Sequence, residues 1–434
     1  MNSKSAFFYT TVSSFLLFSF LLAASFSQAA EYSISSDTII RVFERDTADK
    51  KDALVNPIYE YLQVDIGNKG EAGVSFHGYG WGRADLGDGD YFSDDTDGEL
   101  LYGYLEYAGD WNDLNLRLGR QHIFFGVSNE SLDGLSGSTD ITSYFSIAAY
   151  AGYPVALNNE NGHDGDSLVG GRIEHHMGTL YQIGSSYQRV ANDGDRAEET
   201  LGIDMSFALP GGINLQGHST RNLETDGWAE HYYDLQFTLS DFHVQPFFQH
   251  FQYEDYFSDG IASANPFRYL ADTGETLTVF GGDLSWYKSL NWETAFAAKS
   301  YDYDIRDESS QFFSGQVTWH KGEDLTQIGA EIGYMHGDTA ETNYVLGRTF
   351  VFWDLFLENL PPLFVSWDLL FVSYDEDING EDSSLFSSLG LGAKFMDESL
   401  SVALTGDYSK DPYFDNDIRG QLVVSYKFGK VSKD

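Results

Sequence analysis

The sequence predicts an all-β protein, a transmembrane antiparallel up-and-down β-barrel of about 20 to 22 strands, with 18 also allowed. Three observations predict this class. A signal-like segment opens the chain, and many later segments alternate between apolar and polar residues with the period of a β-strand. Short turns also alternate with longer acidic connections, as in strands that run up and down. The predicted location is the bacterial outer membrane.

The first segment, residues 1–29, is typical of a secretory signal peptide. Lys4 gives a weakly basic start, residues 6–24 are mostly apolar, and Ser-Gln-Ala at 27–29 fits the small-x-small cleavage rule. A membrane anchor helix is the alternative, but polar residues inside the apolar run favour cleavage. We therefore expect residues 30–434 to form a single barrel domain. Strands begin almost directly after the signal, which favours a channel over a transporter gated by a plug.

The composition excludes several classes of protein. The 434 residues carry a net charge of −42, which argues against binding nucleic acid, whose phosphates would be repelled. An aromatic content of 16% argues against disorder. The count of cysteines is 0, which excludes disulfides, lipid attachment at cysteine, cysteine–zinc sites and covalent c-type haem. After residue 29 no apolar run reaches the ~18 residues of a transmembrane helix.

Alternation is clearest near the C-terminus, in the stretch 417–428. Leu422, Val424, Tyr426 and Phe428 share one parity, and polar residues fill most of the other. Such a strand has one face for lipid and one for the lumen. Its terminal aromatics Tyr426 and Phe428 are the expected signal for the barrel-assembly machinery.

Connections between the alternating segments fall into two groups. The short ones are expected to be periplasmic turns, at 67–70, 109–112, 210–212, 240–241, 321–324 and 396–398. The long acidic ones are expected to be outer loops, at 85–98, 254–274, 302–310, 375–382 and 409–417.

Counting strands exposes one conflict. About 21 segments alternate, but single-chain bacterial barrels have an even number of strands. Counting strands from the N-terminus makes 122–140 an outer connection, and counting back from the C-terminus makes 152–166 an outer connection. Both cannot be outer, because the single strand 141–151 between them would have to begin and end on the same side of the membrane. Either a strand is hidden in 122–140, giving about 22, or 141–151 does not span, giving about 20. In the second case residues 122–166 are one long excursion that could fold into the lumen.

Several aromatic residues lie toward strand ends, where interface girdles are expected. They are Trp81, Tyr102, Tyr104, Trp286, Trp292, Trp319, Trp353, Trp367 and Tyr426.

The most specific stretch is 114–126, Leu-Asn-Leu-Arg-Leu-Gly-Arg-Gln-His-Ile-Phe-Phe-Gly, followed by Asp133 and Gly134. It resembles the Arg-x-Gly-Arg-Gln stretch of proteobacterial outer-membrane porins, including the alginate-export and related groups. The resemblance covers about a dozen residues. It implies a strand that leads to a constriction segment, with its basic residues lining the pore. The acidic composition leaves few basic residues for a lumen selective for alginate.

Parity gives the candidate pore-lining residues. Arg117 falls on the polar parity of its strand, whereas Arg120 falls on the apolar parity and should lie at a bulge or a rim, because a charge in lipid is costly. The remaining candidates share lumen parity or adjoin this stretch: Arg41, Gln121, Arg172, Glu174, Glu293, Lys299 and Glu331. Ringed charges could act as an electrostatic filter. Alternatively, the arginines pair with lumen carboxylates and hold the wall together.

A cluster of aspartates in the predicted loop 85–98 offers carboxylate oxygens that could bind calcium. Its candidate ligands are Asp88, Asp90, Asp94 and Asp95. The loop lacks the spacing of a helix–loop–helix calcium site, so a solvated acidic loop bridged by divalent ions to lipopolysaccharide is the simpler interpretation. The pair His175 and His176 is expected at a turn rather than at a metal.

The sequence contains no Gly-x-Ser-x-Gly, His-Glu-x-x-His or phosphate-loop motif, and no cofactor is predicted. We expect an outer-membrane channel for passive diffusion of small hydrophilic solutes or ions, with 122–166 as the constriction. The alternative is a sheath that encloses a multihaem cytochrome partner in an electron conduit. An outer-membrane enzyme is a third, weaker hypothesis. Lipid and lipopolysaccharide are the expected surroundings.

Overall fold

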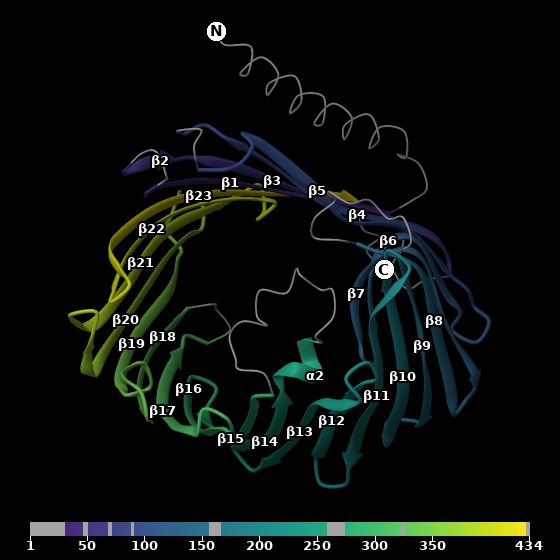
Figure 1. Cartoon of the computed structure of the whole chain (residues 1–434). Coiled ribbons are helices and arrows are strands. Elements are labelled where there is room, and N and C mark those ends of the chain that lie inside the picture. The colour runs from purple at the N-terminus through teal and green to yellow at the C-terminus, as the bar shows by residue number, and fades with distance from the viewer. Residues whose placement is uncertain are drawn as a thin grey trace.

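The barrel predicted from the alternation is the fold of this protein. The computed structural model describes residues 31–46, 51–67, 72–87, 91–155, 166–257, 274–322 and 326–430. These residues form a closed antiparallel barrel of 22 strands (Figure 1). Each wall strand pairs with the next along the chain, and β1 pairs with β23 to close the ring. Residues 1–29, the expected signal peptide, lie outside the described residues.

The wall strands are β1 (Tyr32–Arg45), β3 (Pro57–Ile66), β4 (Gly73–Asp85), β5 (Thr96–Ala108), β6 (Asn115–Phe125), β7 (Ser128–Thr142), β8 (Phe145–Pro154), β9 (Ser167–Met177), β10 (Tyr181–Asn192), β11 (Asp195–Leu209), β12 (Ile213–Asn222), β13 (Gly227–Leu239), β14 (Phe242–Gln252), β15 (Thr276–Ser289), β16 (Trp292–Tyr303), β17 (Glu308–His320), β18 (Gln327–Gly337), β19 (Tyr344–Leu355), β20 (Leu363–Ile378), β21 (Glu381–Phe395), β22 (Leu400–Asp411) and β23 (Phe414–Lys430). Three short elements complete the described part: β2 (Ala53–Val55), α2 (Tyr253–Phe257) and the 3-10 helix η3 (Ala340–Thr342).

The short strand β2 does not change the count. Both β2 and β3 pair with β1, and only Asn56 separates them, so they act as one interrupted wall strand. Tyr32 pairs with Lys430, so the first strand begins and the last strand ends at the same end of the barrel. We call this end the turn end. The opposite end is called the loop end. In the described part, no helix is long and apolar enough to cross a membrane.

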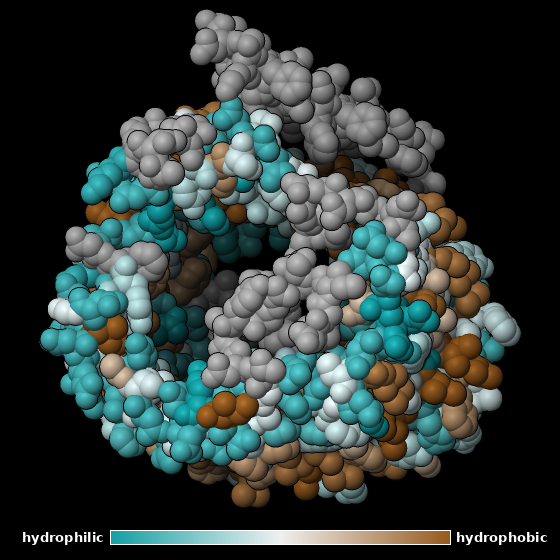
Figure 2. All heavy atoms as spheres, in the orientation of Figure 1, coloured by the Kyte–Doolittle hydropathy of each residue, from teal (hydrophilic) through white to brown (hydrophobic). Residues whose placement is uncertain are grey.

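Side chains alternate between the two faces of the wall. On β6, Leu116 and Leu118 are 39% and 59% exposed on the outer face, whereas Arg117 lies between them on the lumen face. The same alternation holds on β18, where Ile332 is 67% exposed and Glu331 has the opposite parity. Figure 2 shows hydrophobic side chains gathered on the outer wall and hydrophilic ones around the opening. This apolar-out, polar-in wall is the arrangement of an outer-membrane barrel.

The parity conflict is resolved by a strand hidden in 122–140. This strand is β7, which begins at Ser128 and pairs with both β6 and β8. The interpretation of 122–166 as one excursion is therefore wrong, because β8 also belongs to the wall. The strand escaped detection because most of its residues are polar or glycine, so it lacks a continuous apolar face.

Three of the expected long loops are instead tight hairpins. The segments 302–310, 375–382 and 409–417 are mostly strand, and their turns contain only a few residues. Strands that extend past the membrane keep their ladder hydrogen bonds while both faces meet water. They therefore lose the alternation by which the sequence reveals a strand. All six expected short turns join strands that meet at the turn end, although 68–70 and 323–324 lie outside the described residues.

The predicted aromatic girdle is only partly correct. Trp292, Trp367 and Tyr426 are exposed on the outer face. Trp81 of β4 lies on the lumen face instead. Tyr102 and Tyr104 share the lumen face of β5 with Glu106, whose carboxylate binds Arg117. Both faces of this strand contain apolar residues, so parity alone could not tell lipid from lumen.

Candidate functional site: a hairpin folded into the lumen

Part of the β6–β7 ladder leaves the wall. The β5–β6 register ends at Gly103 and Arg120, and the β7–β8 register begins at Leu132 and Pro154. The β6–β7 register nevertheless continues up to Phe125 and Ser128. Residues 121–132 therefore form a two-stranded hairpin that meets the wall ladder only at its base, where Leu132 pairs with Pro154 and the Ser131 carbonyl accepts from the Val155 N–H at 2.9 Å. We call it the in-folded hairpin.

The tip of the in-folded hairpin touches the lumen face of strands further along the wall. The backbone N–H of Val127 donates to Ser186 Oγ of β10 at 2.9 Å. A Cβ on Gly202 of β11 would lie 1.9 Å from Val127 Cγ1, so only glycine allows this approach. Gly126 turns the chain at φ +66°, a conformation that glycine adopts without strain. The hairpin thus crosses the inner face of the wall toward β10 and β11.

A small apolar core fixes the hairpin to the wall. Ile123 and Leu132 of the hairpin pack with Tyr150 of β8 and Leu168 of β9, and all four are at most 3% exposed. Burying an aliphatic side chain of this size contributes about 1.5–3 kcal/mol. The Tyr150 hydroxyl contacts Ser128 Oγ and donates to Gln188 Oε1 at 3.2 Å. These contacts give the hairpin a defined position inside the barrel.

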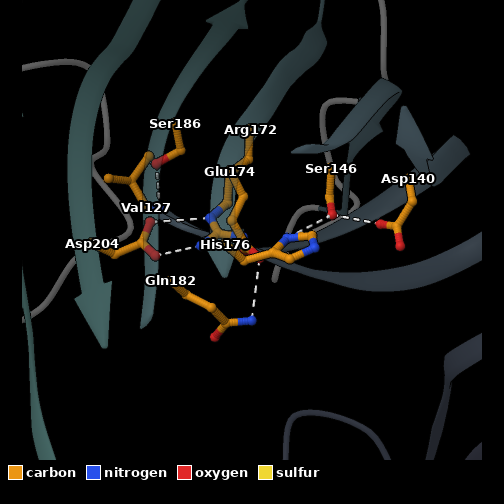
Figure 3. A network of polar contacts seen from close by, with 9 residues as sticks. All are labelled: Val127, Asp140, Ser146, Arg172, Glu174, His176, Gln182, Ser186 and Asp204. Carbon is orange, nitrogen blue, oxygen red and sulfur yellow. Dashed lines mark hydrogen bonds and ion pairs between the residues drawn. The ribbon is translucent and has the colours of Figure 1, made fainter. Parts of the chain in front are cut away.

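A charged cluster lies beside the hairpin tip on β9 and β11 (Figure 3). Arg172 Nε donates to Asp204 Oδ2 at 3.1 Å, and the same guanidinium pairs with Glu174. Glu174 Oε1 also accepts from Gln182 Nε2 at 3.2 Å and lies 3.3 Å from His176 Nδ1. The cluster thus has one arginine for two carboxylates. The histidines occupy β9 itself, contrary to the expected turn.

The same network contains serine, histidine and aspartate but not the geometry of a hydrolase. Ser146 Oγ donates to Asp140 Oδ1 at 2.5 Å and lies 3.4 Å from His176 Nδ1 (Figure 3). A nucleophilic serine gives its proton to the histidine, which a carboxylate orients. Here the hydroxyl bonds directly to the carboxylate instead.

A second element, α2, also reaches into the mouth of the barrel. Figure 1 shows it inside the ring of strands, near β12 and β13. The Asn222 side-chain amide donates to the Asp255 backbone oxygen at 2.8 Å, and Asp255 is 4% exposed. Burial, together with the carboxylates of Glu230 and Glu198, raises the pKa of Tyr256 above its ordinary value. Since Glu198 belongs to β11, α2 lies near the wall that the hairpin covers.

Each predicted basic residue of the Arg-x-Gly-Arg-Gln stretch has a partner. Arg117 Nε donates to Glu106 Oε2 at 2.7 Å. Arg120 Nε donates to Asp133 Oδ1 at 2.8 Å, at the point where the β5–β6 ladder ends. Gln121 is 1% exposed beneath the hairpin, so its side chain does not face open lumen.

The remaining candidates are distributed around the wall. Arg41 Nε donates to Gln421 Oε1 at 3.1 Å. Glu293 Oε2 lies 3.7 Å from His320 Nε2, and Lys299 Nζ lies 5.8 Å from the Phe247 ring centroid. These groups do not form one ring of charge.

Glu331 lies opposite Arg348 in the β18–β19 register, and Arg348 Nε donates to Asp368 Oδ1 at 2.9 Å. The pair Arg348–Asp368 and the partner carboxylates Glu106 and Asp204 are not among the residues predicted from the sequence. These residues come together through the pairing register of neighbouring strands, which the sequence pattern does not reveal. Alternation through 344–355 could have identified Arg348, because it interrupts an apolar stretch.

The proposed metal and assembly residues remain predictions. Asp88 and Asp90 lie outside the described residues. Asp94 and Asp95 are in the described part, which contains no group of three metal-ligating side chains. Tyr426 and Phe428 are 41% and 46% exposed on the outer face near the end of β23.

Comparison with known proteins adds information about the fold. No family model matches this sequence, and no curated protein matches it. The structure is similar to the siderophore receptor PirA from Pseudomonas aeruginosa, with a TM-score of 0.55 and 12% identity over 91% of this chain and 80% of that chain. It is also similar to OccAB4 from Acinetobacter baumannii, with a TM-score of 0.46 and 12% identity over 93% and 99% of the two chains. The similarity to a BenF-like porin from Pseudomonas fluorescens Pf-5 has a TM-score of 0.45 and 9% identity over 93% of this chain and 100% of that chain.

The similarity to the siderophore receptor supports the barrel fold and carries no statement about activity. The location follows from the wall itself. A closed barrel with an apolar outer face pairs the backbone groups of its strands with one another and not with water, as lipid requires. The protein belongs in the bacterial outer membrane.

Proposed function

We propose that this protein is an outer-membrane channel for passive diffusion of small hydrophilic solutes or ions, and that the in-folded hairpin is its constriction. The observation that carries the proposal is the hairpin itself, which crosses the lumen face and is held there by an apolar core and the Val127–Ser186 hydrogen bond. A wall segment that leaves its ladder gives up neighbouring hydrogen bonds. Narrowing the lumen is a function that explains this arrangement.

Charge placement supports a preference for cations over a basic anion filter. Arg117 and Arg348 each bind a carboxylate, and Arg172 binds two. A guanidinium paired in this way stabilises the wall and contributes little positive potential to the pore. The net charge of −42 on the chain acts in the same direction.

The alternative, a sheath around a multihaem cytochrome, needs free space for the partner. The hairpin and α2 both take up part of the lumen near β8–β13, which supports the channel over the sheath. Lipopolysaccharide and the barrel-assembly machinery remain predicted partners.

Planar lipid bilayers provide the test. We expect the purified, folded protein to give discrete conductance steps and a reversal potential that favours cations in a salt gradient. Because the chain has 0 cysteines, single cysteines can be introduced cleanly. A charged methanethiosulfonate reagent should alter the current of Glu331→Cys, which has lumen parity, but not of Ile332→Cys, whose side chain is 67% exposed on the outer face.

A folded protein that gives no steps at any voltage would overturn the channel. Copurification of such a silent protein with a haem protein would favour the sheath instead.

A further inference from the structure

Aromatic rings cover part of the lumen face of β3, β4 and β5. The chain of neighbouring rings runs from Tyr59 to Tyr61, Tyr79, Tyr102 and Tyr104, with centroid distances of 6.4, 6.3, 5.6 and 5.8 Å. Trp81 lies 6.3 Å from Tyr59, and His77 lies 5.2 Å from Tyr104. We call these seven rings the aromatic track.

The track lies on the lumen side of the wall. On β4, Val74 and Phe76 are 69% and 38% exposed on the outer face, and the track residues of that strand have the opposite parity. Tyr59 and Trp81 are nearer the loop end, and Tyr104 is nearer the turn end. The three strands are neighbours in the ring (Figure 1). The track therefore descends along the pore across three strands.

The track departs from the polar lumen expected of a water-filled barrel. Its tyrosines and Trp81 are half-buried, so part of each ring remains open. The in-folded hairpin packs on β8 to β11 and so leaves this part of the wall to the lumen. Exposed aromatic surface that is contiguous and rimmed by polar groups marks a binding surface.

Polar groups of both signs flank the rings. Arg41 lies 5.6 Å from the Tyr59 centroid, and Arg117 lies 5.4 Å from that of Tyr104. On the acidic side, Asp65 Oδ1 lies 2.6 Å from His77 Nδ1, and Glu106 pairs with Arg117. Because Arg117 is paired with Glu106 and Asp65 contacts His77, the groups beside the rings present no large charge of one sign that would favour an ionic ligand. A ligand whose groups both donate and accept hydrogen bonds suits this mixture.

We propose that the aromatic track binds neutral oligosaccharides during their passage through the pore. The C–H faces of a pyranose ring are apolar and stack on aromatic faces, while the hydroxyl edge both donates and accepts. A succession of rings along the pore binds successive sugar units without holding any one tightly. This inference rests on the proposed channel function and names its substrate class.

The test combines current and binding measurements on the full-length, folded protein. The probes are neutral linear hexasaccharides, an α-linked glucan, a β-linked glucan and a β-linked xylan, with polyethylene glycol of equal size as control. We expect at least one hexasaccharide to block the current saturably, and polyethylene glycol not to do so. Intrinsic fluorescence in detergent, with Trp81 as a reporter, should give the same affinity without any current.

Matched variants locate the site. Tyr61→Ala or Tyr79→Ala should weaken sugar binding about three- to ten-fold, as expected for the loss of one aromatic contact. Tyr79→Phe retains the ring and should bind nearly as well as the original protein. Tyr301→Ala removes a tyrosine from the lumen parity of β16, outside the track, and should bind unchanged.

The outcomes separate the two proposals. Normal current steps with no saturable block and no fluorescence change for any hexasaccharide would overturn the track and leave the channel intact. Sugar binding that depends on Tyr79 in a protein without current would overturn the channel alone. Equal loss in the Tyr79→Ala and Tyr301→Ala variants would also overturn the track.

Discussion

Removing the in-folded hairpin should widen the pore by a calculable amount. The variant replaces residues 123–130 with Asn-Gly, so that His122 and Ser131, already opposite each other in the register, flank a two-residue hairpin turn. The change deletes the tip and Ile123, one of the four residues of the apolar core under it. The hydrogen-bonded wall on either side is unchanged, so the barrel should remain closed.

The expected magnitude follows from the strand number. With 22 strands, a spacing of about 4.8 Å and a tilt of about 40° give a backbone ring about 44 Å across, or roughly 34 Å between side chains. The hairpin extends about 20 Å from 121 to its tip and is about 10 Å thick. It therefore takes up about 200 of roughly 900 Å² of lumen cross-section, about a fifth. If current scales with the narrowest area, conductance rises by about a quarter.

Single-channel recording in planar bilayers measures this rise. The control shortens the β20–β21 hairpin by the same Asn-Gly replacement of residues 375–381, which lie beyond the wall at the loop end, and should leave the conductance unchanged. An unchanged step size in a folded hairpin variant would refute the hairpin as the constriction. A rise of several-fold would refute the area estimate, since it would mean that the hairpin nearly closes the pore.

Three further predictions concern charge. Arg172→Ala removes the arginine partner of Glu174 and Asp204 and should lower the free energy of unfolding in urea by about 2 kcal/mol, a value between those of exposed and buried ion pairs. Arg172→Lys should restore part of this loss. Burial alone would raise the pKa of Glu275, but hydrogen bonds from the backbone amides of Ile305 and Arg306 and from the Arg306 side chain lower it. At a pH above 4.5, the ordinary pKa of a glutamate, the ionised Glu275 carboxylate thus stabilises the turn that contains Ile305 and Arg306. The protection of these two amides from hydrogen exchange should be lost as the pH falls through the lowered pKa of Glu275. Neutralising Glu174 and Asp204 together as amides should reduce the cation preference measured by reversal potential.

Sequence patterns predicted the barrel because a wall that contacts lipid on one face and water on the other needs alternating apolar and polar side chains. Lipid demands an apolar face and closure, so strands such as β18 and β23 show their period of two directly. The strand β7 does not, since its first part belongs to the in-folded hairpin, away from lipid. Parity nevertheless showed that one strand was unaccounted for, and a strand within 122–140 was one of the two alternatives that it left open.

The candidate site was less predictable, because it depends on register and on which face is the lumen. Parity put Arg117 on the polar face of its strand, but its partner Glu106 lies on another strand. Tyr102 and Tyr104 were assigned to a lipid girdle because tyrosine suits both an interface and a stacking surface. Only the closed wall shows that they meet Tyr79 inside the barrel.

The hairpin and the track occupy different parts of the wall, which makes their effects separable. Residues 123–130 pack on β8 to β11, whereas Tyr79 lies on β4. Deleting the hairpin should raise conductance by about a quarter while sugar affinity changes less than two-fold, because no ring of the track is lost. Tyr79→Ala should do the reverse, since one side chain takes up little of the cross-section but supplies a stacking face. Measuring both quantities on both variants checks this. If the hairpin deletion weakens sugar binding as much as Tyr79→Ala does, solutes pass between the two features, and the constriction and the binding site are one.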